Sequence, residues 1–559
     1  MGFDAELSRK HFLTGSLFAA FAPFAALAQN SARTAYTIDD VKGAEKLSGI
    51  VLTDDQRKQV LQALAGSRSG LDAIRKTGIS NDIPPAFNFV PHGKKPKAGY
   101  KNDVKPTPPK AFTKPTSAED IAFLTVAELG VLIKNRNLKP SELTEIFLTR
   151  LKQYGPKLKN VITLTDELAR KQALAADDEI AKGKYRGPLH GIPFGLKDLF
   201  AAKDYPTTWG AEPYKDQVIA YNSAVVEKLF AAGAILVAKT SLGALAYGDV
   251  WFGGLTLNPW NPKQGSSGSS AGSSAGTAAG LFAFSIGTET LGSIISPSTR
   301  CRVTGLRPTF GRVSRFGAMA LSWTMDKVGP ICKTAEDCAI VFSVIHGADP
   351  RDPMSVDYPF TYRSSIDLKS LKIGVLVPTS FVASDDPAKD LGTAGTILKS
   401  LGATFIPVKI SSPINGVSEV LTIEASAAFD EITHDGRVDT MKGSLWPPAF
   451  RASSMLTGVD YIQAMRARTT VMRKFEDELG SLDVIIANGS GGDVLVTTNL
   501  TGHPQLFIPM GLNDQARPIG ISLIGRLYEE GTMLAIGNML QQATSVYRKR
   551  PDLTQLPKD

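Results

Sequence analysis

The sequence contains few of the residues that build disulfide frameworks and metal sites. The 559-residue chain has three cysteines, Cys301, Cys332 and Cys338, which are too few for a disulfide framework and lack the CxxC spacing of a zinc site. Its six histidines are scattered, with no HExxH pattern and no paired ligand spacing. We therefore expect no metal ion.

The chain also lacks a broadly distributed excess of positive charge. Its formal charge is +8, but residues 93–116 alone carry seven lysines against one aspartate. Those lysines lie among prolines, a composition typical of an extended linker rather than of a nucleic-acid-binding face. We therefore predict a Pro/Lys-rich linker over 91–116 and no nucleic-acid partner. With 43% hydrophobic and 21% charged residues, the composition excludes a disordered chain and a polytopic membrane protein.

The N-terminus has the pattern of an export signal. Arg9 and Lys10 precede an apolar run over 12–28 that ends in Ala26-Leu27-Ala28. The run is shorter than the roughly 18–20 residues of a membrane span and contains Pro23, which argues against an anchor. We predict a cleavable signal over 1–28, cut after Ala28, that leaves no stable membrane span. The protein is then periplasmic or secreted. The run Ser8 to Leu13 resembles a twin-arginine signal with lysine in second place, so the export route stays open.

The rest of the chain divides by pattern. Helical spacing over 37–76 predicts a small helical N-terminal extension, assigned to 29–90. From residue 117 to 555, short apolar runs alternate with helical segments, with strands predicted at 371–377, 404–410, 482–487 and 519–524. Such alternation predicts an α/β fold with a mixed or parallel sheet. Residues 411–480 are mostly helical and suggest an inserted cap.

A Gly/Ser run over 265–276 has three interpretations. A flexible linker is disfavoured because an apolar segment follows directly, at 277–286. The run contains G-x-S-x-G pentads, but a nucleophile elbow needs a preceding central strand, which Pro259 to Gly265 disfavours. We favour a tight loop that leads into a close-packed helix, where small residues let the backbone approach a ligand.

Two further segments indicate acid–base chemistry. Lys197 lies in the apolar frame of residues 191–200, and a buried lysine has a lowered pKa that suits a general base. The ordinary alternative is a solvent-facing lysine at a strand end. Downstream, residues 287–297 form a glycine-bounded turn with Ser293 at its tip, and successive N–H groups at such a turn are typical of an oxyanion hole.

Together these segments resemble the amidase signature family. Residues 191–200, 268–273 and 287–297 are similar to its three signature segments, with Ser269 and Ser293 24 residues apart. The likeness continues at 305–309, 326–330 and 499–504 and covers roughly 118–545. It implies an α/β/α core with a central mixed sheet flanked by helices, and no cofactor.

The resemblance also implies roles for individual residues. Ser293 is the nucleophile, Ser269 the bridging serine and Lys197 the base, with a cis peptide between Gly268 and Ser269. The oxyanion hole is assigned to the backbone N–H groups of Thr290, Leu291 and Gly292, together with that of Ser293, and supporting roles to Asp198 and Ser270.

The third signature segment departs from the family's commonest form at two positions. Leu291 stands where glycine is usual, and it would be strained if its φ were positive. Ile295 replaces an arginine, which removes a partner for the acid at Glu289.

The predicted function is that of an exported serine amidohydrolase acting on a small-molecule or peptide amide. A homodimer is compatible with the sequence. Two alternatives stay open: a non-catalytic binding protein on the same scaffold, and the glutamine-amidating subunit of a tRNA-dependent amidotransferase, which an export signal disfavours. Trp251, Phe252, Trp323 and Trp446 either line an acyl pocket or pack in the core or cap.

Overall fold

The computed structural model describes residues 36–79, 102–108, 112–377, 386–441, 443–512 and 518–557. The predicted signal over 1–28 lies outside these residues.

A large mixed sheet runs through the structure. Within this part, eleven strands form one sheet in the order β14 (Phe405–Val408), β13 (Ile373–Leu376), β15 (Val484–Asn488), β17 (Pro518–Gly525), β16 (Gln505–Leu512), β10 (Thr304–Arg307), β11 (Lys327–Cys332), β9 (Phe284–Glu289), β3 (Pro193–Lys197), β4 (Ile235–Thr240), β2 (Val161–Leu164). Each strand predicted at 371–377, 404–410, 482–487 and 519–524 is present.

Parallel and antiparallel pairs alternate in blocks. Strands β13, β14 and β15 pair in parallel, as do β3, β4 and β9, whereas the strands between them are antiparallel. Every residue of β3, β4, β9 and β11 is buried, as expected for strands covered on both faces. The predicted mixed α/β fold is confirmed.

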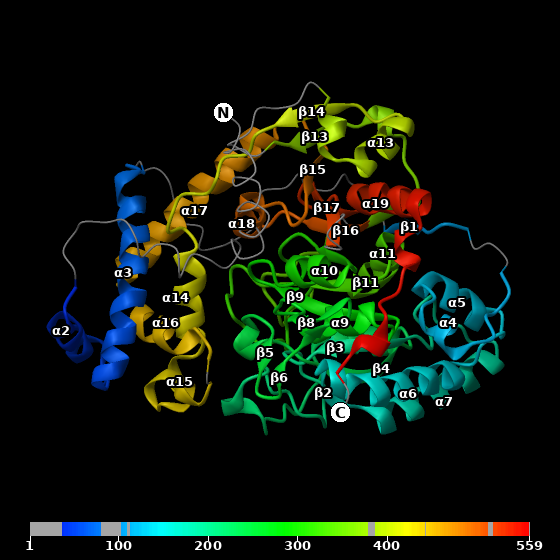
Figure 1. Ribbon diagram of the computed structural model, residues 1–559, viewed down its shortest axis with the longest axis horizontal. Coiled ribbons are helices and arrows are strands. Elements are labelled where there is room, and N and C mark those ends of the chain that lie inside the picture. The colour runs from blue at the N-terminus through cyan, green and yellow to red at the C-terminus, as the bar shows by residue number, and fades with distance from the viewer. Residues whose placement is uncertain are drawn as a thin grey trace, which may run out of the picture.

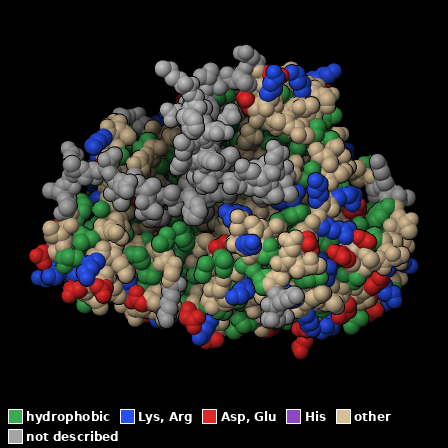
Figure 2. Space-filling model, in the orientation of Figure 1, with side chains coloured by type: hydrophobic (Ala, Val, Ile, Leu, Met, Phe, Trp, Pro, Cys, Tyr) green, Lys and Arg blue, Asp and Glu red, His purple; other side chains and the backbone are tan. Residues whose placement is uncertain are grey.

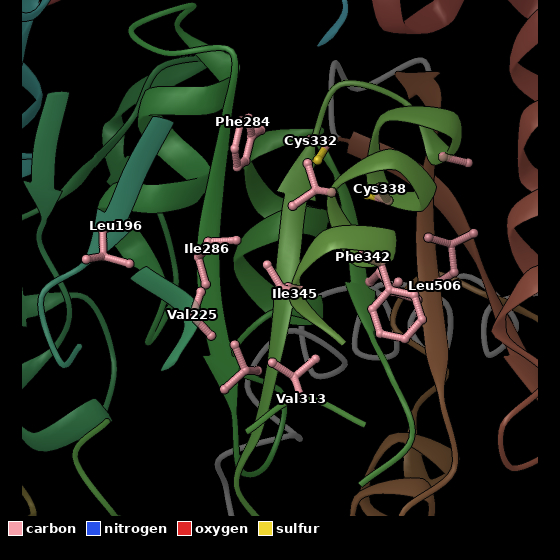
Figure 3. Close-up of a cluster of buried hydrophobic side chains, with 14 of the residues drawn as sticks. Leu196, Val225, Phe284, Ile286, Val313, Cys332, Cys338, Phe342, Ile345 and Leu506 are labelled. Atoms are coloured by element: carbon pink, nitrogen blue, oxygen red, sulfur yellow. The ribbon is translucent and has the colours of Figure 1, made fainter. Parts of the chain in front are cut away.

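Helices cover the sheet and complete the layers (Figure 1). The helices that follow the extension, up to the predicted cap, are α4 (Ala118–Ala122), α5 (Val126–Lys134), α6 (Pro140–Leu158), α7 (Asp166–Ala181), α8 (Ala224–Ala231), α9 (Ala271–Ala278), α10 (Ile295–Cys301), α11 (Ala335–Ile345), α12 (Pro387–Asp390) and α13 (Thr393–Ser400). After the cap come α18 (Asp493–Thr501) and α19 (Glu530–Thr544). Figure 3 shows how Phe342 and Ile345 of α11 lie with Phe284 and Ile286 of β9 in the apolar core.

The Gly/Ser run forms the predicted tight loop and close-packed helix. All eight residues of α9 are buried. A Cβ on Gly272 would lie 2.3 Å from the carbonyl oxygen of Asn160, so only glycine fits at that position. The preceding β8 (Asn261–Gly265) pairs only with β7 (Leu257–Asn258) in a two-stranded ribbon, outside the main sheet of the described residues. A nucleophile elbow, which follows a central strand, is therefore excluded.

The N-terminal helices pack against the predicted cap. Helix α2 (Ile38–Ser48) packs on α3 (Asp54–Lys76). Helix α3 in turn lies beside the cap helices α14 (Glu419–Ala428), α15 (Asp430–His434), α16 (Trp446–Ser453) and α17 (Gly458–Leu479) (Figure 1). Helix α3 contacts α14, α16 and α17. Arg68 pairs with the fully buried Asp460 at 3.0 Å, and Ser67 donates to Glu419 at 3.0 Å. Helix α3 of the extension is therefore joined to the cap by partly buried polar contacts.

Part of the predicted linker is an ordered strand. Residues Asp103–Lys105 form β1, which pairs in parallel with β12 (Thr361–Arg363). The backbone N–H and the hydroxyl of Thr107 donate to the Glu336 carboxylate. This stretch therefore runs along the α/β body instead of through solvent. The one remaining ribbon pairs β5 (Val250–Trp251) with β6 (Gly254–Leu255) in the described part.

The visible surface carries mixed charge. Figure 2 shows acidic and basic side chains interspersed along the lower rim of this face. Among the described residues, no helix combines the length and the hydropathy that crossing a bilayer requires.

Candidate active site

The site is built where two parallel strands end side by side. Strand β3 pairs with β9 in a register that places Leu196 opposite Ile286. Lys197 ends β3 and the turn containing Ser293 follows β9, so both lie at the carboxyl edge of the sheet, where α/β proteins place their ligands.

Lys197 is buried and hydrogen-bonded within this edge. Its side chain is fully inaccessible, and its Nζ lies 2.8 Å from Ser269 Oγ and 2.9 Å from Thr288 Oγ1. Burial lowers the pKa of Lys197 to about 7, against a smaller opposite effect of Asp326 and Glu289. The prediction of a buried lysine is confirmed, and its lowered pKa makes a neutral amine available near neutral pH.

The two serines before α9 connect the strands. The Gly268–Ser269 peptide is cis, as the resemblance implied. Ser270 donates its backbone N–H to the carbonyl of Ser293 at 3.0 Å and its hydroxyl to the carbonyl of Thr288 at 3.1 Å. A Cβ on Gly287 would lie 2.7 Å from Ser270 Oγ, so this approach requires glycine. The structure thus brings Lys197, Ser269 and Ser270 together with the Ser293 turn.

Ser293 is slightly more accessible than the rest of this cluster. The residue is 4% exposed, whereas Ser269 is fully buried. Within the described part of the chain, the Ser293 hydroxyl donates no hydrogen bond. The backbone bond from Ser270 to the Ser293 carbonyl holds the Ser293 turn against the residue that follows Ser269.

The turn before Ser293 supplies unpaired backbone N–H groups. In the described residues, the N–H groups of Thr290, Leu291 and Gly292 donate to no protein acceptor. The left-handed residue is Gly292, at φ 95°, and Leu291 is outside that region. Leucine at 291 is therefore accommodated without backbone strain.

Glu289 has replacements for the missing arginine. Arg307 donates to its Oε1 at 2.7 Å and Asn499 to the same oxygen at 2.8 Å. The backbone N–H groups of Ile294 and Ile295 donate to its Oε2 at 2.8 and 2.9 Å. Burial raises the pKa of Glu289, but Arg307 and the Ile295 N–H outweigh it and hold the pKa below its usual value. The loss of arginine at 295 therefore leaves the carboxylate fully partnered.

Asp198 points to different partners. Its carboxylate forms an ion pair with Lys239 at 2.7 Å and accepts from the N–H of Thr208 at 2.8 Å, and all three side chains are buried. Asp198 was expected to orient the reacting groups. In the described chain it hydrogen-bonds to none of Lys197, Ser269 and Ser293, so it does not orient them by direct contact. Its ion pair instead secures the loop that follows β3 to β4.

Two residues of the site, Thr288 and Asp326, had no predicted role. Thr288 holds Lys197 through its hydroxyl, and Asp326 accepts from the Thr290 hydroxyl at 2.6 Å. Both lie inside segments that resemble the family, 287–297 and 326–330, so their position in the sequence could have indicated that they belong to the site. The contact of Thr288 with Lys197 depends on the pairing of β9 with β3, and that of Asp326 with Thr290 on the pairing of β9 with β11. No local pattern reveals either pairing.

The match to a family is extensive. A family model described as "Amidase" matches residues 142–492, more than half of the chain. The chain belongs to the amidase signature family. A glutamyl-tRNA(Gln) amidotransferase subunit from Chloroflexus aggregans is 32% identical over 488 residues, which cover 78% of this chain and 99% of the relative.

Solved structures of the family share the fold. The native peptide amidase from Stenotrophomonas maltophilia has a TM-score of 0.68 at 28% identity, covering 77% of this chain and 98% of its own. An amidase family protein from Bacillus anthracis has a TM-score of 0.70 at 25% identity, covering 78% and 94%. As a member of the amidase signature family, the chain is an amide-hydrolysing enzyme.

Proposed function

We propose that this amidase is an exported serine amidohydrolase that cleaves a carboxamide through an acyl-enzyme on Ser293. The observation that carries the proposal is the buried pair of Lys197 Nζ and Ser269 Oγ, 2.8 Å apart, beside the Ser293 turn. A lysine whose pKa is about 7 is largely neutral at and above neutral pH, whereas an exposed lysine, with a pKa of about 10.4, is protonated there and has no free lone pair to accept a serine proton.

The proposed reaction moves one proton through Ser269. Neutral Lys197 takes the Ser269 hydroxyl proton while Ser269 takes that of Ser293, whose Oγ bonds to the amide carbon. The negative charge that forms on the carbonyl oxygen is held by the N–H groups of Thr290, Leu291 and Gly292. The C–N bond then breaks, and the leaving nitrogen receives the proton back from Lys197 through Ser269. Water attacks the acyl ester by the same relay, releasing a carboxylate and restoring Ser293.

A pair of serine variants tests the nucleophile. Ser293→Ala should abolish amine or ammonia release and covalent labelling by a serine-reactive phosphonate. Ser296→Ala, three residues away and partly exposed, should retain both. Labelling that persists in folded Ser293→Ala would overturn the assignment.

The proposal of export rests on the sequence of residues 1–28. Cell fractionation and N-terminal sequencing should find a mature chain outside the cytoplasm that begins at Gln29. Full-length protein confined to the cytoplasm would contradict it.

A second candidate function is favoured by the curated relatives. Glutamyl-tRNA(Gln) amidotransferase subunits from Chloroflexus aggregans and Geobacillus thermodenitrificans align over 99% of their own length with this chain. If this chain works in such an amidotransferase, it should co-purify with other subunits and support amidation of glutamyl-tRNA. The exported amidohydrolase should instead turn over simple amides as an isolated chain.

A further inference from the structure

A cavity of about 390 Å³ lies next to the candidate active site. Its lining includes Thr288 and Thr290, which flank Glu289, and Leu199, two residues beyond Lys197. The cavity therefore lies at the edge of the sheet where Lys197 and the oxyanion turn meet. Its volume suits a small organic group, since ligand pockets commonly measure about 300–1,000 Å³.

Most of the lining is apolar. The larger apolar side chains include Leu199, Phe316, Met319, Leu321, Trp323 and Met354. Methionine adapts its shape to different apolar groups. Of the four aromatic residues that the sequence suggested for an acyl pocket, Trp323 lines this cavity, whereas Trp446 is buried and donates its indole N–H to the carbonyl of Leu245.

Two of the charged residues in the lining, Arg315 and Asp352, are paired with each other. Arg315 donates through Nε and one terminal nitrogen to the two carboxylate oxygens of Asp352, at 3.0 and 2.8 Å. The backbone N–H of Arg315 adds a third bond to the same carboxylate at 2.8 Å. This pair presents no spare charge to a substrate.

The two other charged residues are also satisfied. Arg351 donates to Glu227 and Asp349 and lies over the ring of Phe316. Asp326 accepts from the Thr290 hydroxyl and from the N–H groups of Leu321 and Ser322. Each charged side chain of the lining therefore has its partners on the protein.

A charged substituent would lose its hydration in this cavity without gaining a partner, whereas an apolar one would gain by burial. We infer that the substrates carry an uncharged alkyl or aryl group on the scissile amide, and that this cavity holds it. The inference rests on the proposed function and narrows it to neutral, apolar amides.

Matched amides test the inference on the wild-type enzyme. Hexanamide, glutaramic acid and 5-aminopentanamide have similar lengths and end in a methyl, a carboxylate and an ammonium group. N-pentylacetamide and 4-acetamidobutanoate repeat the comparison on the amine side. We expect kcat/KM to be about tenfold or more higher for the neutral member in at least one series. Equal or higher values for the charged members in both series would overturn the inference.

A variant with a new charge tests the cavity itself. Trp323 is 48% exposed, so Trp323→Lys can place an unpaired cation at the lining without burying it. This variant should lower the ratio of kcat/KM for the apolar amide to that for its carboxylate analogue by about tenfold. Phe252→Lys is the control, because Phe252 is similarly exposed, at 41%, and does not line the cavity. An unchanged ratio in Trp323→Lys, or the same change in both variants, would overturn the assignment.

Phosphonate labelling separates this inference from the proposed function. An enzyme that labels at Ser293 but prefers charged amides contradicts the inference alone. An enzyme that neither labels at Ser293 nor releases amine contradicts the proposed function, and the inference with it.

Discussion

At the scale of single residues, the chemistry depends on how Lys197 is kept neutral. Desolvation lowers the pKa of Lys197 to about 7, while the negative charges of Asp326 and Glu289 act in the opposite direction. The base must be unprotonated to accept a proton, so activity is lost as the pH falls below this value.

The first prediction concerns this pH dependence. We expect kcat/KM for amide hydrolysis to rise with pH through about 7 and then level off. Asp326→Asn removes a charge that raises the pKa of Lys197, so the rising limb should move to lower pH. Rate profiles of the wild type and the Asp326→Asn variant across about pH 5–9 would measure this shift. A rising limb that stays in place or moves to higher pH would contradict the prediction.

Lys197→Met removes the base, so it should lower the rate by about 10²–10⁴-fold at every pH.

The second prediction concerns the buried carboxylate behind the oxyanion turn. In Glu289→Gln, the side-chain NH2 is itself a donor and would face either the Arg307 guanidinium or the backbone N–H groups of Ile294 and Ile295, which are also donors. The substitution also leaves Arg307 buried without its counter-ion. We expect the free energy of unfolding to fall by about 3–5 kcal/mol, measured by urea denaturation. Glu431→Gln, at an exposed ion pair with Arg437, should change it little. Equal effects of the two substitutions would refute the buried role.

At the scale of elements, the close contact between α3 and the loop before α14 shows how the extension is attached. A Cβ on Gly70 would lie 2.7 Å from the Cα of Gly416, whereas a Cβ on Gly66 of the same helix would meet nothing within 4 Å. Leu71 and Ile74 of α3 belong to the main apolar core of the protein. The helix is therefore packed against the body as tightly as an internal element.

The third prediction uses this matched pair of glycines. Gly70→Ala should lower the free energy of unfolding by about 1–3 kcal/mol, because the methyl group forces α3 away from backbone atoms. Gly66→Ala should raise it by about 0.5–1 kcal/mol, because alanine favours the helix. Thermal or urea unfolding of the two variants would measure the difference. Stabilisation by both substitutions would show that α3 does not pack on the cap in solution.

At the scale of the whole molecule, the reactivity of the three cysteine thiols indicates how tightly the α/β body is packed. Cys301, Cys332 and Cys338 are free and buried, and burial raises the pKa of the Cys301 and Cys332 thiols. Thiols in this state are unreactive, because the thiolate is the nucleophile.

The fourth prediction follows from that state. The native protein should react with a thiol reagent such as DTNB far more slowly than the unfolded protein, which should release colour for all three cysteines. Rapid reaction of one or more thiols in the folded enzyme would mean that part of the core opens readily. Reducing agents should leave amide hydrolysis unchanged.

The sequence was enough to predict that residues of the recognisable motifs lie together in the site. Lys197 and Ser269 occur in apolar and glycine-rich frames respectively, and the structure places them 2.8 Å apart. Asp198 shows the limit of this approach, because its partner Lys239 lies on the neighbouring strand β4 and was assigned no role. Thr288 was missed for the same reason: its contact with Lys197 follows from strand pairing.

The sequence by itself determined the local elements and the family, because hydrophobic periodicity and motif spacing depend on residues close together in the chain. Strands such as β13 and β17 were predictable, since roughly four to eight apolar residues between turns favour extended structure whatever they pack against. Only the tertiary structure decided which side chains meet. The register of β3 against β9, the partners of Glu289 and the packing of α3 on the cap join residues tens to hundreds of positions apart. Such contacts arise from how whole elements pack together, and no local pattern encodes them.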